Sequence, residues 1–386
     1  MKAGIAALAL GYVLSQFYRA FLAVLAPQME ADLGLSAADL SRASGIWFLV
    51  FAAMQIPVGW ALDRIGPRLT ASVLLGLCGA GGAALFATAT SGWQIDVAMG
   101  LIGAGCSPVL MAPYYIFARV YPAAVFATLA GVLIGVGSLG NIAASLPLSW
   151  AVEAFGWRGA IAALALTTLI VAVACGALVR DPAAPETTTR GSLLDLLRIP
   201  AMWAILPMMA VNYAPAAGLR GLWAGPYVAD VFDPGAVGTV TLVMGLAMIA
   251  GNVAYGPLDR VFGTRKWVVL TGNLLGALCC LTLWAMPDAG LWRAAALLAA
   301  VGALGSSFPM LVAHGRAFFP PHLVGRGVTL MNLFGIGGVG AMQFATGPAF
   351  RAAGGGVDGY AILFAAFGVA LLLGCAVYLF APDATD

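Results

Sequence analysis

Two arginines stand inside long apolar stretches of the chain, where a charged side chain is unexpected. Arg19 lies in "SQFYRAFLAVLAP" (15–27), and Arg220 lies in "GLRGLW" (218–223). A guanidinium group stays protonated at physiological pH, and its planar N–H donors match two oxygens of a carboxylate or phosphate. In the middle of a membrane helix such a charge costs at least ~2.5–3.5 kcal/mol, so it needs water, a partner or a ligand. The pair therefore indicates a site that binds an anion.

The acidic residues offer these arginines almost no partner at a similar depth. Nearly all of them fall in polar segments, and Asp96 alone enters an apolar stretch, near its end. We therefore expect Arg19 and Arg220 to bind a ligand. The alternative is that they bond to backbone carbonyls, or that one of them pairs with Asp96.

Other polar and aromatic residues of the apolar stretches fall three, four or seven positions apart, as Tyr12, Gln16 and Arg19 do. These spacings put Tyr12 and Gln16 on one helix face with Arg19, and Tyr213 and Tyr227 nearly in line with Arg220. On another span, Asn332 and Gln343 are eleven apart and share a face. Gln55 is a further polar residue, on the second apolar stretch. Such side chains add hydrogen bonds or ring contacts for the organic body of an anion. The candidate binding residues are Arg19, Arg220, Gln16, Tyr12, Tyr18, Tyr114, Tyr115, Tyr213, Trp223, Tyr227, Asn332 and Gln343.

The composition places these residues in a membrane. Of 386 residues, 62% are hydrophobic and 9% are charged, whereas a soluble domain has ~25% charged residues. The mean hydropathy is +0.97. The six cysteines lie in apolar segments without metal-ligand spacing, so buried thiols are expected. No metal, cofactor or nucleic-acid partner is predicted.

Apolar runs of the ~20 residues that a spanning helix needs recur twelve times. A membrane barrel would instead show shorter segments with alternating polarity. We therefore predict an all-α integral membrane protein. The expected spans are 4–28, 43–62, 70–90, 93–118, 125–150, 158–179, 201–228, 236–257, 266–286, 292–317, 325–349 and 359–380.

The longest polar stretch, "RDPAAPETTTRGSLLDLLRIP", separates two sets of six spans. It predicts an N-terminal six-helix bundle (1–179), a cytoplasmic linker (180–200) and a C-terminal six-helix bundle (201–386). Lysines and arginines outside the spans divide twelve to four between the two sides. By the positive-inside rule both termini are cytoplasmic, and the expected location is a cytoplasmic (inner) membrane.

The two halves repeat each other. The segment "GWALDRIGPRLT" (59–70) follows the second span, and "YGPLDRVFGTRKWV" (255–268) follows the eighth. In the fifth and eleventh spans, "GVGSLG" (135–140) matches "GIGGVG" (335–340) at an offset of 200. The two span arginines are 201 positions apart. These anchors predict two pseudo-symmetric bundles of one topology, related by an axis along the membrane normal.

Over its whole length the chain resembles the major facilitator superfamily. The family signature Gly-x-x-x-Asp-Arg-x-Gly-x-Arg follows the second span as Gly59, Asp63, Arg64, Gly66 and Arg68. The stretch "GWRGA" (156–160) is similar to the usual entry of the sixth span. The resemblance implies two bundles around a central cavity, lined by spans one, four, seven and ten, that transport by alternating access.

The signature and its second copy are expected to gate this cycle. Glycine permits a tight turn, and Asp63 can cap a helix or pair with an arginine when the inner side closes. The alternative is a static staple of the loop. In the second copy Tyr255 stands where the signature has glycine. The candidate gating residues are Gly59, Asp63, Arg64, Arg68, Asp259 and Arg260.

In span one, Arg19 followed by Pro27 resembles the pattern of organophosphate and other organic-anion antiporters of that superfamily. The resemblance implies a small organic anion such as a carboxylate or phosphate, carried by anion exchange or proton symport. Asp96 and His314 are the candidates for proton coupling. The expected partners are this substrate and the lipid bilayer, with a monomer as the family default.

Three alternatives remain open at this point. One is a zwitterionic or drug-like substrate. Another is copper import, because Met244 and Met248 lie four apart and thioethers bind copper(I). The third is a non-transporting receptor on the same fold. An enzyme is not expected, because the spans show no nucleophile–base pair.

Overall fold

The structure is a computed structural model that describes residues 2–121, 123–182, 193–320 and 324–384. Side chains at 63, 118, 123–128, 130–131, 193–194 and 324–326 are outside this description. The chain forms two compact units, Met1–Glu186 and Thr187–Asp386, called here the N-terminal and the C-terminal bundle. The predicted linker bounds of 180–200 stay a prediction, and residues 183–192 of that segment lie outside the described residues.

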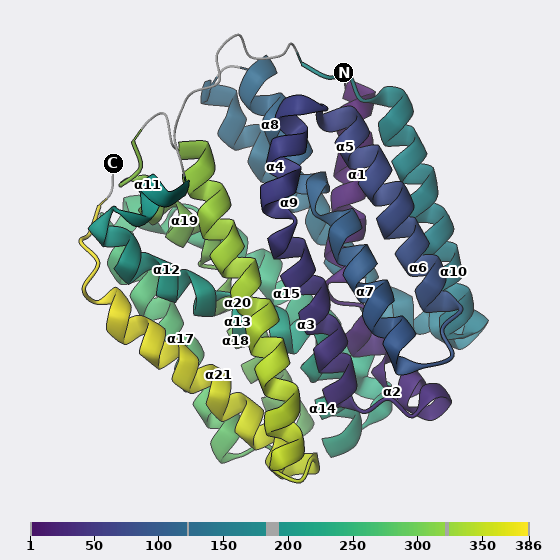
Figure 1. The fold of residues 1–386 in the computed structure, drawn as a ribbon. Coiled ribbons are helices and arrows are strands. Elements are labelled where there is room, and N and C mark those ends of the chain that lie inside the picture. Colours follow the sequence, from purple (N-terminus) through teal and green to yellow (C-terminus); the bar gives the residue numbers. More distant parts are fainter. Residues whose placement is uncertain (1, 122, 183–192, 321–323, 385–386) are drawn as a thin grey trace. The chain divides into compact units, whose positions relative to one another are not determined.

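The N-terminal bundle is built from helices alone among its described residues (Figure 1). Its elements are α1 (Lys2–Tyr18), α2 (Leu22–Leu33), α3 (Ala37–Ala53), α4 (Gln55–Arg64), α5 (Pro67–Val73), the π-helical η1 (Leu74–Ala80), α6 (Gly81–Ala87), α7 (Gly92–Cys106), α8 (Pro108–Val120), α9 (Ala123–Ala143) and α10 (Leu146–Leu178).

The C-terminal bundle is likewise helical where it is described. Its elements are α11 (Leu193–Leu197), α12 (Pro200–Asn212), α13 (Ala214–Gly218), the π-helical η2 (Leu219–Trp223), α14 (Ala224–Val231), the 3₁₀-helical η3 (Pro234–Ala236), α15 (Val237–Tyr255), α16 (Leu258–Phe262), α17 (Lys266–Ala285), α18 (Leu291–Gly305), α19 (Phe308–Arg316), α20 (Val324–Ala352) and α21 (Gly356–Tyr378).

Ten helices of the described residues are long and apolar enough to cross a membrane, and the bent pair α1–α2 makes eleven. Twelve spans were predicted. The remaining one, 125–150, coincides with α9 and the start of α10, and only the shorter apolar stretch Val132–Ala143 is found there. Gly156 separates this start from the rest of α10, because its φ of 70° interrupts the helix.

Spans one and seven are the irregular ones. Span one bends by 52° between α1 and α2, and the three residues of that break begin with Arg19. Span seven is interrupted at Tyr213 and then passes through the π-helical turn η2. Pro215 follows this interruption, and proline cannot donate a backbone hydrogen bond. Polar side chains thus coincide with the places where the regular helix stops.

The repeated glycine motifs explain how span five packs on span one and span eleven on span seven. Gly140 of α9 lies directly against the backbone carbonyl of Val13 in α1, and Gly338 of α20 against that of Ala210 in α12. Any side chain at either glycine would collide with this backbone. Small residues let membrane helices approach closely, so the motif "GVGSLG" and its copy are packing surfaces.

In each bundle, a carboxylate after the last span accepts a hydrogen bond from the start of another helix of the same bundle. Asp181 accepts a hydrogen bond of 2.8 Å from the backbone N–H of Arg68, at the start of α5. Asp383 accepts one of 3.1 Å from the N–H of Lys266, at the start of α17. An anion is favourable at a helix N-terminus, where the N–H groups lack helical partners.

The basic side chains of the same two residues donate hydrogen bonds back to backbone carbonyls at the end of the last span. Arg68 donates from Nε to the carbonyl of Gly176 near the end of α10, at 2.7 Å. Lys266 donates from Nζ to the carbonyl of Leu379 after α21, also at 2.7 Å. In the sequence, Asp181 and the equivalent Asp383 are acids of polar segments, and nothing local indicates which helix they reach.

We predict that Asp383→Ala destabilises the protein by about 1 kcal/mol, as loss of a helix cap does. Partial burial by itself raises the pKa of Asp383, but hydrogen bonds from Thr264 and Lys266, with His314 nearby, lower it overall. The stabilisation is therefore full above the ordinary carboxyl pKa and is lost as the pH falls through the lowered value. Thermal unfolding in detergent measures it. The exposed Glu30→Ala is the control, and equal melting temperatures for both variants would contradict the cap.

Candidate functional site

Arg19 is held against an aromatic surface within the N-terminal bundle. Its guanidinium carbon lies 4.9 Å from the ring centre of Phe51 and 5.4 Å from that of Trp47, both on α3. Cation–π attraction stabilises such a charge when water is excluded. None of the ion pairs found in the described part of the chain involves Arg19. Its Nε is buried and makes no hydrogen bond.

Two buried glutamines belong to the elements next to this arginine. Gln16 precedes it by three residues in α1 and is 7% exposed. Gln55 begins α4 and is 2% exposed, and its Nε2 donates to the carbonyls of Phe51 (3.2 Å) and Ser107 (3.5 Å). Gln55 is thereby fixed to the helix that carries the aromatic surface. Trp47 and Phe51 are not among the residues predicted from the sequence, where their spacing of four positions is the one signal that could have indicated them.

Arg220 lies in the C-terminal bundle on the π-helical turn η2 and is 2% exposed. Its guanidinium packs on Gly245 of α15, where an added Cβ would lie 2.9 Å from Nη2 and 3.0 Å from Nε. Because Gly245 has no side chain, the guanidinium of Arg220 fits beside it. Single π-helical turns are frequent at functional sites, because they redirect a side chain that a regular helix would turn elsewhere.

A hydrogen-bonded network holds the turn that carries Arg220. Trp223 donates from Nε1 to Gln343 Oε1 (3.0 Å) and to Thr346 Oγ1 (3.1 Å). Gln343 donates from Nε2 to the carbonyl of Gly218, just before the turn, at 3.0 Å. The polar groups of Trp223 and Gln343, both candidates for ligand binding, therefore bind one another and the backbone, so the structure gives them a positioning role.

The tyrosine candidates of the N-terminal bundle divide into two groups. The ring of Tyr12 packs on Gly137 of α9, and the hydroxyl of Tyr18 forms a 2.8 Å hydrogen bond with Thr168 of α10. These two rings are buried in helix contacts. Tyr114 and Tyr115 on α8 are half-buried, and the ring of Tyr115 carries the guanidinium of Arg119 at 3.8 Å.

In the C-terminal bundle, Tyr213 stands at the break of span seven with its ring 5.5 Å from Phe308. Tyr227 is 1% exposed and donates its hydroxyl hydrogen to the carbonyl of Pro287, so it stabilises the fold. Asn332 is half-buried on α20. The structure therefore leaves Tyr213 and Asn332 as the polar candidates of this bundle with partly accessible side chains.

The signature loop is held within the N-terminal bundle. Gly66 has a φ of 93°, and a Cβ there would lie 2.7 Å from the carboxyl carbon of Asp181. Gly59 faces open space and Arg64 is exposed. The side chain of Asp63 is outside the described residues. With the Arg68 contacts, this arrangement matches the static staple that the sequence left open beside gating.

The second copy of the signature is held in the same way inside the C-terminal bundle. Asp259 accepts a hydrogen bond of 3.2 Å from Nε of Arg265, and Arg260 is exposed. Tyr255, which replaces the first signature glycine, is 8% exposed and lays its hydroxyl on Gly272 of α17. The departure from the signature is therefore a packing contact.

Both candidates for proton coupling have defined partners. Asp96 Oδ2 accepts from Nε and Nη2 of Arg42, at 3.0 and 2.9 Å. His314 is fully buried, with Nδ1 2.6 Å from the hydroxyl of Tyr378 and Nε2 3.0 Å from the carbonyl of Pro382. Because a carbonyl only accepts, the hydrogen sits on Nε2 and the ring fixes the segment after α21. These contacts favour structural roles for both residues.

The methionines proposed for copper binding lie in a helix interface. Met244 and Met248 of α15 pack against Gly302 of α18, and they are 0% and 6% exposed. No cluster of three or more histidine, cysteine or acidic side chains occurs in the described part of the chain. Packing accounts for these thioethers, so copper import gains no support.

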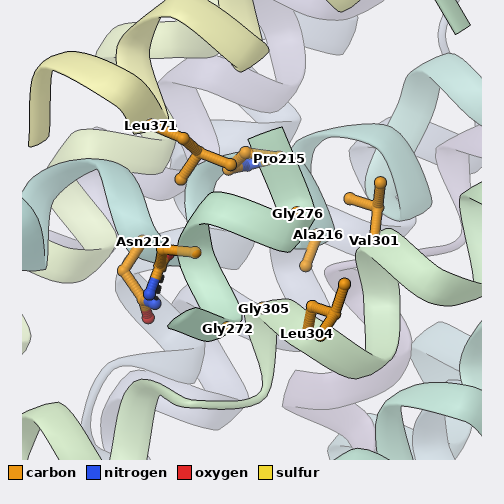
Figure 2. Close-up of a pocket in the computed structure, with 10 residues that line it drawn as sticks. Asn212, Pro215, Ala216, Gly272, Gly276, Val301, Leu304, Gly305 and Leu371 are labelled. Carbon is orange, nitrogen blue, oxygen red and sulfur yellow. Dashed lines mark hydrogen bonds between the residues drawn. The ribbon is translucent and has the colours of Figure 1, made fainter. Parts of the chain in front are cut away.

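One small cavity lies inside the C-terminal bundle (Figure 2). Its volume is about 10 Å³, which is room for one water molecule. Asn212 lines it and donates from Nδ2 to Asn273 Oδ1 (2.9 Å) and Ser307 Oγ (2.8 Å). The space is too small for an organic anion, so this cavity is not a substrate site.

Comparison with known proteins gives the family. The model of the Major Facilitator Superfamily matches residues 8–224, which is more than half of the chain. The comparison with curated proteins found no match.

Solved structures share the fold. Crystal structures of a bacterial homologue of the human lysosomal transporter Spinster, inward-facing and either occupied or unoccupied, align with TM-scores of 0.75 and 0.77. Both are 17% identical and cover 98% of this chain and 96% of theirs. The nucleoside transporter NupG aligns with a TM-score of 0.75 at 14% identity, covering 98% and 99%. The apolar spans, the helical fold and the family match agree: this multi-pass integral membrane protein belongs to the major facilitator superfamily.

Proposed function

We propose that this protein transports a small organic anion by alternating access, and that Arg19 and Arg220 each bind the anion during the cycle. The observation that carries the proposal is the environment of Arg19. Its guanidinium lies inside a span, rests on two aromatic rings and forms no ion pair within the described residues. A charge in such a place persists where it meets a ligand or water.

The distribution of carboxylates supports an anionic ligand. Asp96 was the acidic residue within an apolar stretch that the sequence offered to Arg19. It is instead bonded twice to Arg42. A positive charge whose nearest candidate partner is already neutralised favours binding of a mobile anion over a fixed internal ion pair.

The geometry at Arg19 also suits a planar oxygen pair. Phe51 and Trp47 lie close to the guanidinium carbon, and a guanidinium that rests against rings still has N–H groups with which to bind a ligand. Two parallel N–H···O bonds from that edge match a carboxylate or a phosphate. Arg220, on its π-helical turn against Gly245, supplies the equivalent charge of the second bundle.

We infer exchange of one anion for another as the coupling mode, because both candidates for proton transfer are engaged in structural contacts. Exchange needs no titrating residue, since the same arginines bind either anion. A location in the cytoplasmic membrane, with both termini in the cytoplasm, follows from the distribution of basic residues and completes the proposal, together with the monomer that is the family default.

Arg19→Lys and Arg220→Lys are each predicted to reduce anion exchange more than tenfold. Lysine keeps the charge but replaces the planar fork by a single ammonium group. Counterflow of labelled organic carboxylates and phosphates in proteoliposomes measures the rate. Arg198→Lys is the matched control, because the side chain of Arg198 is 82% exposed. Wild-type rates in both span variants would overturn the proposal.

Asp96→Asn is predicted to leave anion counterflow within twofold of wild type, because the carboxylate serves a pair with Arg42 rather than a proton step. The measurement compares counterflow with uptake driven by a pH gradient into vesicles without internal anion. Strong gradient-driven uptake that disappears in Asp96→Asn would show proton symport in place of exchange.

Gly245→Ala is predicted to weaken anion binding at least tenfold while the protein still folds. The new methyl group would overlap the guanidinium of Arg220, which must then leave its place. Anion-dependent thermal stabilisation gives the affinity, and size-exclusion chromatography monitors folding. Gly81→Ala is the control, because nothing lies within 4 Å of a Cβ built on Gly81 of α6. Equal affinities in the two variants would refute the role of this space.

A further inference from the structure

Four polar atoms around Arg19 have no hydrogen-bond partner in the structure, although each is buried. They are Gln16 Oε1, Arg19 Nε, Trp47 Nε1 and Gln55 Oε1, and we call their residues the Arg19 cluster. All four residues belong to the N-terminal bundle, on α1, the break after it, α3 and α4. Buried polar groups are normally paired, so these four atoms make the cluster a candidate place for a ligand to form hydrogen bonds.

Contacts and sequence spacing connect the residues of the cluster. Trp47 and Phe51 contact the Arg19 guanidinium. Gln55 is bonded to the Phe51 carbonyl through Nε2, and Gln16 is one helical turn from Arg19. The bonds of Gln55 Nε2 also settle the orientation of its amide: the nitrogen faces the backbone, and Oε1 remains as an acceptor.

The chemical types of these atoms restrict the ligand. Arg19 Nε and Trp47 Nε1 are donors, and they are satisfied by the oxygens of an anion. Gln16 Oε1 and Gln55 Oε1 are acceptors, which an anionic oxygen cannot satisfy and would repel. A ligand that pairs all four groups must therefore carry hydrogen-bond donors close to its anionic group.

We propose that the Arg19 cluster selects organic anions that also carry hydroxyl or ammonium groups, with Gln16 and Gln55 accepting from them. This inference rests on the proposed function and narrows its substrate class. Hydroxy acids, sugar phosphates and amino acids belong to the selected class. Simple alkyl carboxylates and alkyl phosphates do not, because their bodies leave both amide oxygens unpaired.

Matched ligands test the proposal on the purified full-length protein. The carboxylate series is propionate, glycerate and β-alanine, which have three carbons and differ in hydroxyl or ammonium groups. The phosphate series is propyl phosphate and dihydroxypropyl phosphate. Anion-dependent thermal stabilisation gives the half-saturating concentration of each. In at least one series, we expect the half-saturating concentration of the donor-bearing ligand to be at least tenfold lower than the half-saturating concentration of its plain counterpart.

Two variants connect this selectivity to the cluster. Gln16→Leu and Gln55→Leu each remove an amide acceptor, and each is expected to reduce the selectivity ratio to threefold or less. Gln28→Leu on α2 is the control, because Gln28 is half-buried outside the cluster, and it is expected to keep the ratio. Anion binding to Gln16→Leu at the affinity of the plain ligand shows that the variant is folded.

The outcomes separate this inference from the proposed function. If the ligands of each series bind with equal affinity, and this binding is lost in Arg19→Ala, the selection of donor-bearing anions is overturned and the proposal of anion transport stands. Selectivity that survives in both glutamine variants would overturn the assignment to the Arg19 cluster. Absence of stabilisation by any of these anions would overturn the proposed function, and this inference with it.

Discussion

A chain that crosses a bilayer must pair its backbone N–H and carbonyl groups internally, because hydrocarbon offers no partner. This constraint explains why the described spans are helical and why their few interruptions are informative. Where the helix stops, amide side chains replace the lost bonds. Gln343 donates a hydrogen bond to the carbonyl of Gly218 beside η2, and Gln55 donates to the carbonyls of Phe51 and Ser107. The breaks are thus stabilised by groups that also position the charged side chains nearby.

The two bundles share a topology but not a chemistry. In both, a glycine motif brings the fifth span of the half against the first, through Gly140 and Gly338. Around the arginines they differ, because Arg19 rests on aromatic rings while Arg220 fills the space beside Gly245. Arg19 is partly exposed, and Arg220 is 2% exposed. The repeat has therefore kept an arginine in the first span of each bundle while its surroundings changed.

The sequence was sufficient for the fold, because apolar length, the signature and the internal repeat are written in consecutive residues. It predicted the helical class and the family, and it singled out both arginines. It did not predict the aromatic surface of Trp47 and Phe51, the π-helical turn, or the Arg42–Asp96 pair. Each of these depends on which helices become neighbours. For the same reason, Tyr18, Trp223, Tyr227 and Gln343 were expected to bind a ligand but are hydrogen-bonded within the fold.

The carboxylates after the last span of each bundle have a mechanical consequence. Asp181 joins α10 to the start of α5, and Asp383 joins the end of the chain to the start of α17. The basic residue beside each junction returns a second bond in the opposite direction. Two opposed bonds resist both sliding and rotation of one helix along the other. The two hydrogen bonds thus couple helices that are far apart in the chain, so a rotation of one helix is passed to its neighbour at this junction.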